Sequence, residues 1–159
     1  MVILDVCDKL SLLKDMRVVF IDTLYHFPQT YEHVRAIQSF YPDIQLSIYK
    51  PLGADTREQF EERYGKDLWE TDPDRFGYLT KAEPRDRALL DTKASIYING
   101  RRADQGGLRD GLELAEYDET LNVTQIQPLF DWTGAQVWEY IRRFDVPCMS
   151  KFYYLFRLN

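Results

Sequence analysis

The sequence predicts an α/β domain built on a largely parallel β-sheet. Short apolar runs typical of strands alternate with longer segments whose apolar residues recur at helical spacing. Connections between parallel strands are right-handed, so helices should cover the sheet. At 159 residues the chain corresponds to one domain, long enough to bury a proper core.

The composition excludes several classes of protein. The formal net charge of -6 argues against a general nucleic-acid surface. We expect neither a membrane span nor a signal peptide, because Asp5 and Asp8 interrupt the first apolar stretch, and the cytoplasm is the expected location. The two cysteines, Cys7 and Cys148, lie far apart, which argues against a disulfide framework and against a metal or iron–sulfur site built from this chain alone.

The first half of the chain contains four predicted elements. Residues 2–14 carry a helical apolar stripe, and residues 17–21 form a continuous apolar run typical of a strand buried on both faces. Pro28 opens a second helix, because proline fits the first turn. Its predicted buried face consists of Tyr31, Val34, Ile37 and Tyr41. Residues 45–49 form a second strand.

The next elements are marked by capping and turn signals. Thr56 and Gln59 have the spacing of a capping box, which predicts a helix start, and Gly65 marks its end. A turn over residues 81–84 precedes a helix over residues 83–91.

A short apolar run over residues 95–98 predicts a third, buried strand. Two further short segments follow at 112–117 and 122–126. Thr133, three residues before a glutamine, forms a second capping-box pattern and opens the last helix. The core stripe of that helix is Val137, Ile141 and Phe144.

Residues 100–109 are the most informative stretch of the chain. This loop follows the third predicted strand and contains Arg101, Arg102, Asp104, Gln105 and Arg109. Guanidinium groups bind phosphate and sulfate oxygens through paired hydrogen bonds, and the glycines of the loop let its backbone approach a ligand closely. The stretch therefore predicts a pocket for one small, highly charged anion. The alternative is a solvated, charged surface loop.

A second polar group, Asp22, Thr23 and His26, directly follows the first predicted strand. In a parallel sheet the carboxyl ends of the strands share one edge, where ligands of α/β proteins bind. We therefore expect this group and the arginine loop to converge on one crevice, with Lys81 nearby. The alternatives are a polar turn for the first group and an exposed side chain for Lys81.

Several motifs resemble the phosphoadenylyl-sulfate (PAPS) reductase family. Residues 20–30 are similar to the FIDTLYHFPQT stretch of that family, and residues 81–84 to its KVEP. Residues 100–109 resemble its GRRxDQxxxR motif. Agreement over residues 60–72 is closest to the fungal form, and residues 128–147 match the region that follows.

The resemblance implies an adenine-nucleotide alpha-hydrolase-like fold of the PP-loop superfamily. It also implies an oxidoreductase of sulfate assimilation and cysteine biosynthesis. The family reduces PAPS to sulfite and adenosine 3',5'-bisphosphate, with thioredoxin or glutaredoxin as reductant. Carried over by position, Lys81, Arg101, Arg102 and Arg109 would bind phosphates and sulfate. A homodimer is possible.

Related adenylyl-sulfate reductases hold a [4Fe-4S] cluster through cysteine pairs, one of them just before the KVEP equivalent. Residues 76–80 occupy that place here and contain no cysteine. The resemblance therefore favours the cluster-free PAPS type.

The chain also departs from the family at both ends. The family's PP-loop precedes the helix expected at residues 2–14, so we expect the first strand and the PP-loop to be missing. The tail with the nucleophilic ECGIH-type cysteine is missing too. We accordingly divide the chain into a PAPS reductase-like core, residues 1–147, and a divergent segment, residues 148–159, with no catalytic residue assigned.

Three hypotheses remain open on the sequence alone. The first is a PAPS reductase represented by a truncated chain. The second is a non-catalytic nucleotide-binding remnant of the same fold. The third is another PP-loop enzyme acting on adenylates. The arginine loop favours the first over the third, whereas the missing tail cysteine keeps the second open.

Overall fold

The structure is a computed structural model that describes residues 1–109 and 111–148. Its helices and strands, in chain order, are α1 (Val2–Lys9), β1 (Arg17–Ile21), α2 (Pro28–Phe40), β2 (Gln45–Tyr49), α3 (Arg57–Tyr64), α4 (Leu68–Thr71), α5 (Pro73–Gly77), α6 (Glu83–Thr92), β3 (Ile96–Ile98), β4 (Ala115–Asp118), β5 (Val123–Ile126) and α7 (Gly134–Phe144). Short 3-10 turns lie at Leu13–Asp15, Ala103–Gln105 and Gly107–Arg109. The segment expected to diverge from residue 148 onward lies, except for Cys148, outside the described residues.

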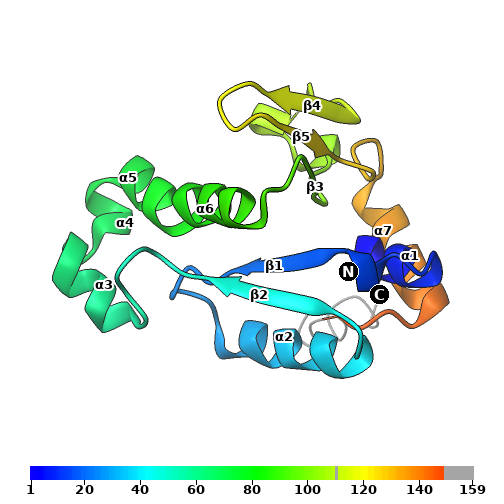
Figure 1. The fold of residues 1–159 in the computed structure, drawn as a ribbon, viewed down its shortest axis with the longest axis horizontal. Coiled ribbons are helices and arrows are strands. Elements are labelled where there is room, and N and C mark those ends of the chain that lie inside the picture. Colours follow the sequence, from blue (N-terminus) through cyan, green and yellow to red (C-terminus); the bar gives the residue numbers. More distant parts are fainter. Residues whose placement is uncertain (110, 149–159) are drawn as a thin grey trace.

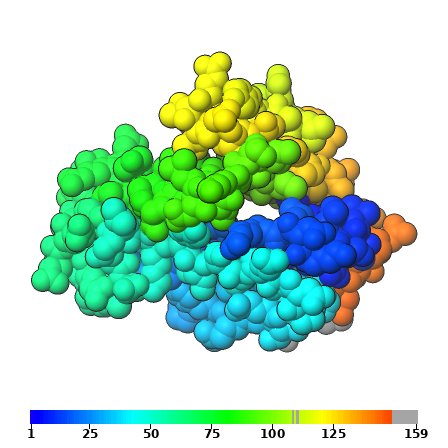
Figure 2. Space-filling model, in the orientation of Figure 1, coloured from blue at the N-terminus to red at the C-terminus, as the bar shows by residue number. Residues whose placement is uncertain are grey.

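The prediction of an α/β fold with parallel strands is confirmed, but the described strands form two sheets. β1 pairs in parallel with β2, and in the second sheet β5 lies between β3, which is parallel to it, and β4, which is antiparallel. In Figure 1, α2 runs along one side of β1 and β2, and α6 runs along the other. Figure 2 shows an opening between the blue N-terminal segment and the green segment that leads into β3.

Several predicted boundaries are confirmed. Strands β1 and β2 match the two predicted apolar runs, and α2 begins at Pro28. The predicted helix over residues 2–14 is wrong in length, because α1 ends at Lys9. Ser11 has a left-handed φ of 58°, which an α-helix of L-residues cannot accommodate, so the remaining apolar residues continue as a turn.

The expectation that β1 and β3 are buried strands is wrong. The exposed fraction is 37% for Val19 on β1 and 54% for Ile96 on β3. Each of these strands has only one hydrogen-bonded neighbour among the described strands, so within this part of the chain each is an edge strand. An apolar run therefore does not distinguish a central strand from an edge strand.

The turn predicted at residues 81–84 is helical instead. A single π-helical turn, Tyr78–Ala82, joins α5 to α6 and carries Lys81. Pro84 lies in the first turn of α6, where the absence of its N–H is tolerated. The wider π-turn is a local change of helix register, a feature found often at functional sites.

Both predicted capping residues begin their helices. At α7 the box is reciprocal: the Thr133 side chain accepts from the Gln136 N–H, and the Gln136 side chain accepts from the Thr133 N–H. At α3, Thr56 accepts from the Gln59 N–H at 3.3 Å, but the Gln59 side chain accepts from Asp55 N at 2.7 Å. Only half of the predicted box therefore forms there.

The buried apolar side chains of the described residues form three small clusters. One joins α1 to α7 around Val2 and Ile141, and another joins α1 to α2 around Cys7 and Tyr41. The third surrounds Phe60 on α3. None of the helices described here has both the length and the apolar character needed to cross a bilayer.

Candidate functional site

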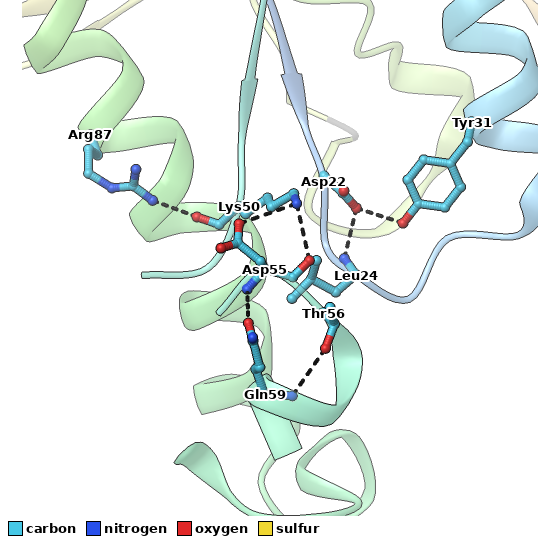
Figure 3. Close-up of polar contacts among 8 residues, drawn as sticks. All are labelled: Asp22, Leu24, Tyr31, Lys50, Asp55, Thr56, Gln59 and Arg87. Carbon is cyan, nitrogen blue, oxygen red and sulfur yellow. Dashed lines mark hydrogen bonds and ion pairs between the residues drawn. The ribbon is translucent and has the colours of Figure 1, made fainter. Parts of the chain in front are cut away.

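The polar residues that follow β1 form a tightly bonded turn (Figure 3). Asp22 is only 5% exposed, and its Oδ1 accepts hydrogen bonds from Leu24 N at 2.9 Å and from the Tyr31 hydroxyl at 2.8 Å. Burial and the hydrogen bond to Asp22 raise the pKa of Tyr31 to about 12. The described contacts of Asp22 therefore shape the turn after β1.

The carboxyl end of β2 contributes a second polar group, which sequence reasoning missed (Figure 3). Lys50 Nζ donates to the backbone oxygen of Asp55 at 3.1 Å and lies 3.4 Å from its Oδ1, while Arg87 Nη2 donates to the Lys50 carbonyl oxygen at 2.5 Å. The sequence Lys50-Pro51 gives no sign that Lys50 joins β2 to other parts of the fold, because its partners, Asp55 and Arg87, lie outside that strand.

Thr23 and His26 are held by the same turn. Thr23 Oγ1 accepts from Tyr25 N at 3.3 Å, so its hydroxyl proton remains available to a ligand. His26 Nε2 lies 3.1 Å from the Ile21 carbonyl oxygen, which can only accept a hydrogen bond, so Nε2 carries a proton. The imidazole lies against Phe20 and Tyr31, with ring centroids at 5.3 and 6.0 Å.

A cavity of about 440 Å³ lies between the end of β1 and the helical run at α5 and α6. Three of the predicted site residues line it together: Thr23, His26 and Lys81. Arg85, which the sequence analysis did not select, also lines it, and the remaining lining residues are Ile21, Gly77 and Ala82. The cavity wall thus carries two cations and no carboxylate, an arrangement suited to an anion.

The arginine loop is fixed to the start of α7. Asp104 Oδ1 accepts from Arg102 Nε at 2.9 Å, and its Oδ2 accepts from Gly134 N at 2.5 Å. The hydrogen bond from Arg102, with a smaller contribution from that of Gly134, lowers the pKa of Asp104. Asp104 therefore holds Arg102 in place.

The amide of Gln105 orders the rest of the loop. Its Oε1 accepts from Arg109 Nη1 at 2.5 Å and from Arg102 N at 3.4 Å. The Arg101 backbone N–H donates to Asn99 Oδ1 at 3.1 Å. The loop thus presents three guanidinium groups, two of which are positioned by neighbouring side chains.

The structure divides the predicted site residues into two groups. Asp22, Thr23, His26 and Lys81 surround the end of β1, whereas the loop residues lie beside α7. The premise that both groups share one sheet edge is wrong, because β1 and β3 belong to different sheets among the described strands.

Tyr97 on β3 provides an electrostatic connection between the groups. Burial raises its pKa, and the positive charges of Arg85 and Arg101 oppose that shift. Arg85 lines the cavity beside β1, and Arg101 begins the arginine loop. Both guanidinium groups are therefore within electrostatic reach of the same side chain.

The described residues hold no group of three or more His, Cys, Asp or Glu side chains that could bind a metal ion. The two cysteines pack in different apolar clusters, Cys7 between α1 and α2 and Cys148 against the α1–α7 cluster. Burial raises the pKa of both thiols. Both are therefore further from the reactive thiolate form than a free cysteine.

Comparison with known proteins gives a consistent family. The chain is 38% identical over 149 residues to a phosphoadenosine phosphosulfate reductase of Emericella nidulans and 40% identical over 151 residues to that of Saccharomyces cerevisiae. These matches cover 92% of this chain but 48% and 58% of the two relatives. The chain thus spans about half the length of these relatives.

A crystal structure of phosphoadenylyl-sulfate reductase from Candida auris, in complex with phosphate, has a similar fold. The TM-score is 0.76 at 36% sequence identity, over 90% of this chain and 69% of that one. Residues 1–155 match the family described as the phosphoadenosine phosphosulfate reductase domain. A match over nearly the whole chain, together with the shared fold, shows that this chain belongs to the phosphoadenosine phosphosulfate reductase domain family.

Proposed function

We propose that the protein reduces 3'-phosphoadenylyl sulfate to sulfite and adenosine 3',5'-bisphosphate, as an oxidoreductase of sulfate assimilation. The observation that carries this proposal is the arginine loop, in which Asp104 and Gln105 orient Arg102 and Arg109. Guanidinium groups held in this way suit a ligand with phosphate and sulfate groups. In the proposal they bind the substrate together with Lys81 and Arg101.

The proposed reaction transfers the sulfuryl group to a thiol. A thiolate attacks the sulfuryl sulfur, the bond from that sulfur to the phosphate oxygen breaks, and adenosine 3',5'-bisphosphate leaves. A second thiol then attacks the cysteine sulfur, releases sulfite and leaves a disulfide. Negative charge builds up on the leaving phosphate in the first step, and nearby guanidinium groups would stabilise it.

Neither described cysteine is the proposed nucleophile. Burial raises the pKa of both Cys7 and Cys148, and no lysine, arginine or histidine is paired with either thiol among the described contacts. A reactive cysteine has the opposite environment, in which nearby positive charge lowers the thiol pKa. The described part of the chain is accordingly proposed to bind the substrate, and the nucleophile is assigned to neither residue.

The proposal includes no iron–sulfur cluster. Two cysteines in separate clusters cannot supply the ligands that such a cluster needs. Thioredoxin or glutaredoxin is the proposed reductant: its first thiol releases sulfite and leaves a mixed disulfide, and its second thiol then attacks that disulfide, frees the enzyme's cysteine and leaves the reductant as an intramolecular disulfide. The cytoplasm is the proposed location, since free thiols such as these two persist in a reducing compartment.

A non-catalytic nucleotide-binding protein is the second candidate function. The raised pKa of both described thiols favours it, since a binding protein needs no thiolate. A thioredoxin-coupled sulfite assay separates the two candidates. The assay should compare this chain with a longer version that includes the residues encoded directly before and after it.

We expect sulfite only from the extended chain, and we expect Cys148→Ser to leave that activity in place. Sulfite from the short chain that Cys148→Ser abolishes would mean that Cys148 is the nucleophile. If the extended chain binds adenosine 3',5'-bisphosphate but forms no sulfite, the non-catalytic candidate is correct.

A further inference from the structure

We propose that Arg85 is a substrate-binding residue, which pairs with Lys81 in the cavity beside β1 to hold a phosphate group of the nucleotide. This inference rests on the proposed function and names a residue that the motifs of the sequence did not indicate.

The two cations come from one helical run. Lys81 lies at the end of the π-helical turn and Arg85 in the first turns of α6. Side chains four positions apart in a helical run share a face, and both of these line the same cavity of about 440 Å³. Thr23 lines the same cavity and adds a hydroxyl that can donate to a phosphate oxygen.

The cavity wall contains no carboxylate to neutralise these charges. The Arg85 guanidinium pairs with Asp86 at 2.6 Å, but Asp86 does not line the cavity. Both close contacts of Arg85 go to a single oxygen, Asp86 Oδ1. A guanidinium has five N–H donors, so at least three remain available to a ligand. Lys81 makes no hydrogen bond or ion pair to another described side chain in the structure.

Arg85 also lines a second hollow, of about 390 Å³. Glu116, Asp118 and Glu119 line it with Tyr97, so its wall is acidic and repels an anion. Arg85 therefore lines both an acidic hollow and a basic cavity. A phosphate group is attracted to the cavity that Lys81 also lines and repelled by the carboxylates of the acidic hollow.

The position of Arg85 also defines the kind of ligand. Arg85 and Tyr97 line the same hollow, and Arg101 follows Tyr97 closely along the chain after β3, so we infer that one extended molecule can reach both the cavity pair and the arginine loop. Two separate cationic groups match a nucleotide with two anionic groups. Arg85 would then contribute more to binding a nucleoside bisphosphate than to binding a monophosphate.

The test is calorimetric titration of Arg85→Met and the parent chain with adenosine 3',5'-bisphosphate, adenosine 5'-monophosphate and adenosine. Methionine keeps an unbranched apolar stem and removes the charge. We expect bisphosphate affinity to fall roughly tenfold to a hundredfold, the range for one lost charge-assisted hydrogen bond. Adenosine affinity should not change, and Arg85→Lys should recover part of the loss.

Two controls make the outcomes decisive. Arg75→Met removes an arginine of α5 that does not line the cavity, and it should bind like the parent. Arg101→Met tests the arginine loop. If Arg101→Met weakens bisphosphate binding and Arg85→Met does not, this inference is overturned and the proposed function stands. A parent chain that binds adenosine as tightly as the bisphosphate overturns both.

Discussion

The carboxylate of Asp104 accepts a 2.5 Å hydrogen bond from the backbone N–H of Gly134, the first residue of α7. The same carboxylate accepts from Arg102 Nε. One side chain thus stabilises the positive end of a helix dipole and fixes the Arg102 guanidinium. The arginine loop and α7, which lie far apart in sequence, are joined at this point.

Asp104→Asn should loosen that junction in a pH-dependent way. The hydrogen bond from Arg102 lowers the pKa of Asp104, so its contribution to stability is present above the ordinary Asp pKa of about 4. The contribution is lost as pH falls through the lowered value in the folded state. We expect the parent to lose more stability than Asp104→Asn between about pH 5 and pH 2 in urea unfolding. Asp131→Asn, a change at an exposed acid of the same region, should behave like the parent.

Tyr31→Phe should destabilise the turn after β1 by roughly 1.5–3 kcal/mol, because it removes a hydrogen bond to a buried carboxylate. The pKa of Tyr31 is raised to about 12 in the folded protein. The contribution of the protonated Tyr31 hydroxyl to the free energy of unfolding is therefore complete below the ordinary tyrosine pKa of about 10, and it is lost as the pH rises through about 12. Urea unfolding at neutral pH and an absorbance titration of tyrosine check both parts. Tyr78→Phe, at a side chain that is 56% exposed, is the control. Equal effects of the two changes would show that the Asp22–Tyr31 contact contributes nothing.

Arg102→Met should weaken binding of adenosine 3',5'-bisphosphate by tenfold or more, on the order of 1.5–3 kcal/mol, since it removes a positioned guanidinium. The matched change on an exposed arginine of α7, Arg142→Met, should have no effect. Fluorescence or calorimetric titration at fixed salt measures both. If the two variants bind equally well, the arginine loop does not face the ligand.

Alkylation of the two cysteines should be slow at neutral pH. Burial raises the pKa of Cys7 and of Cys148, so the thiolate fraction stays below that of a free cysteine. Iodoacetamide labelling followed by mass spectrometry should show rates that rise only as pH passes above about 8.5. Labelling of Cys148 that is already complete at pH 7, faster than that of glutathione, would show that its surroundings activate the thiol.

Ile96→Thr should reduce self-association of this chain. Ile96 is 54% exposed on β3, whose only described neighbour is β5, and an exposed apolar edge strand promotes aggregation. Threonine keeps the β-branched shape that favours a strand. Light scattering and binding of a hydrophobic dye should both decrease. Leu90→Thr, at an exposed residue of α6, tests whether loss of any apolar surface has the same effect.

The sequence by itself determined the local elements and the chemistry of the loop. Strands β1 and β2 and the start of α2 follow from apolar runs and from the fixed φ of Pro28, which act within a few residues. The pairing of Asp104 with Arg102 follows from their proximity in one short turn. The family motifs, being contiguous stretches, were also accessible without coordinates.

Only the tertiary structure decided which groups meet. The separation of the strands into two sheets, the exposure of Val19 and Ile96, and the position of Arg85 depend on contacts between distant segments. An apolar run has the same appearance whether one or two strands pair with it. Likewise, a charged residue at the start of a helix gives no sign of the cavity that it faces. Periodicity and capping act over one or two turns of chain, whereas a cavity wall is assembled from elements that packing alone brings together.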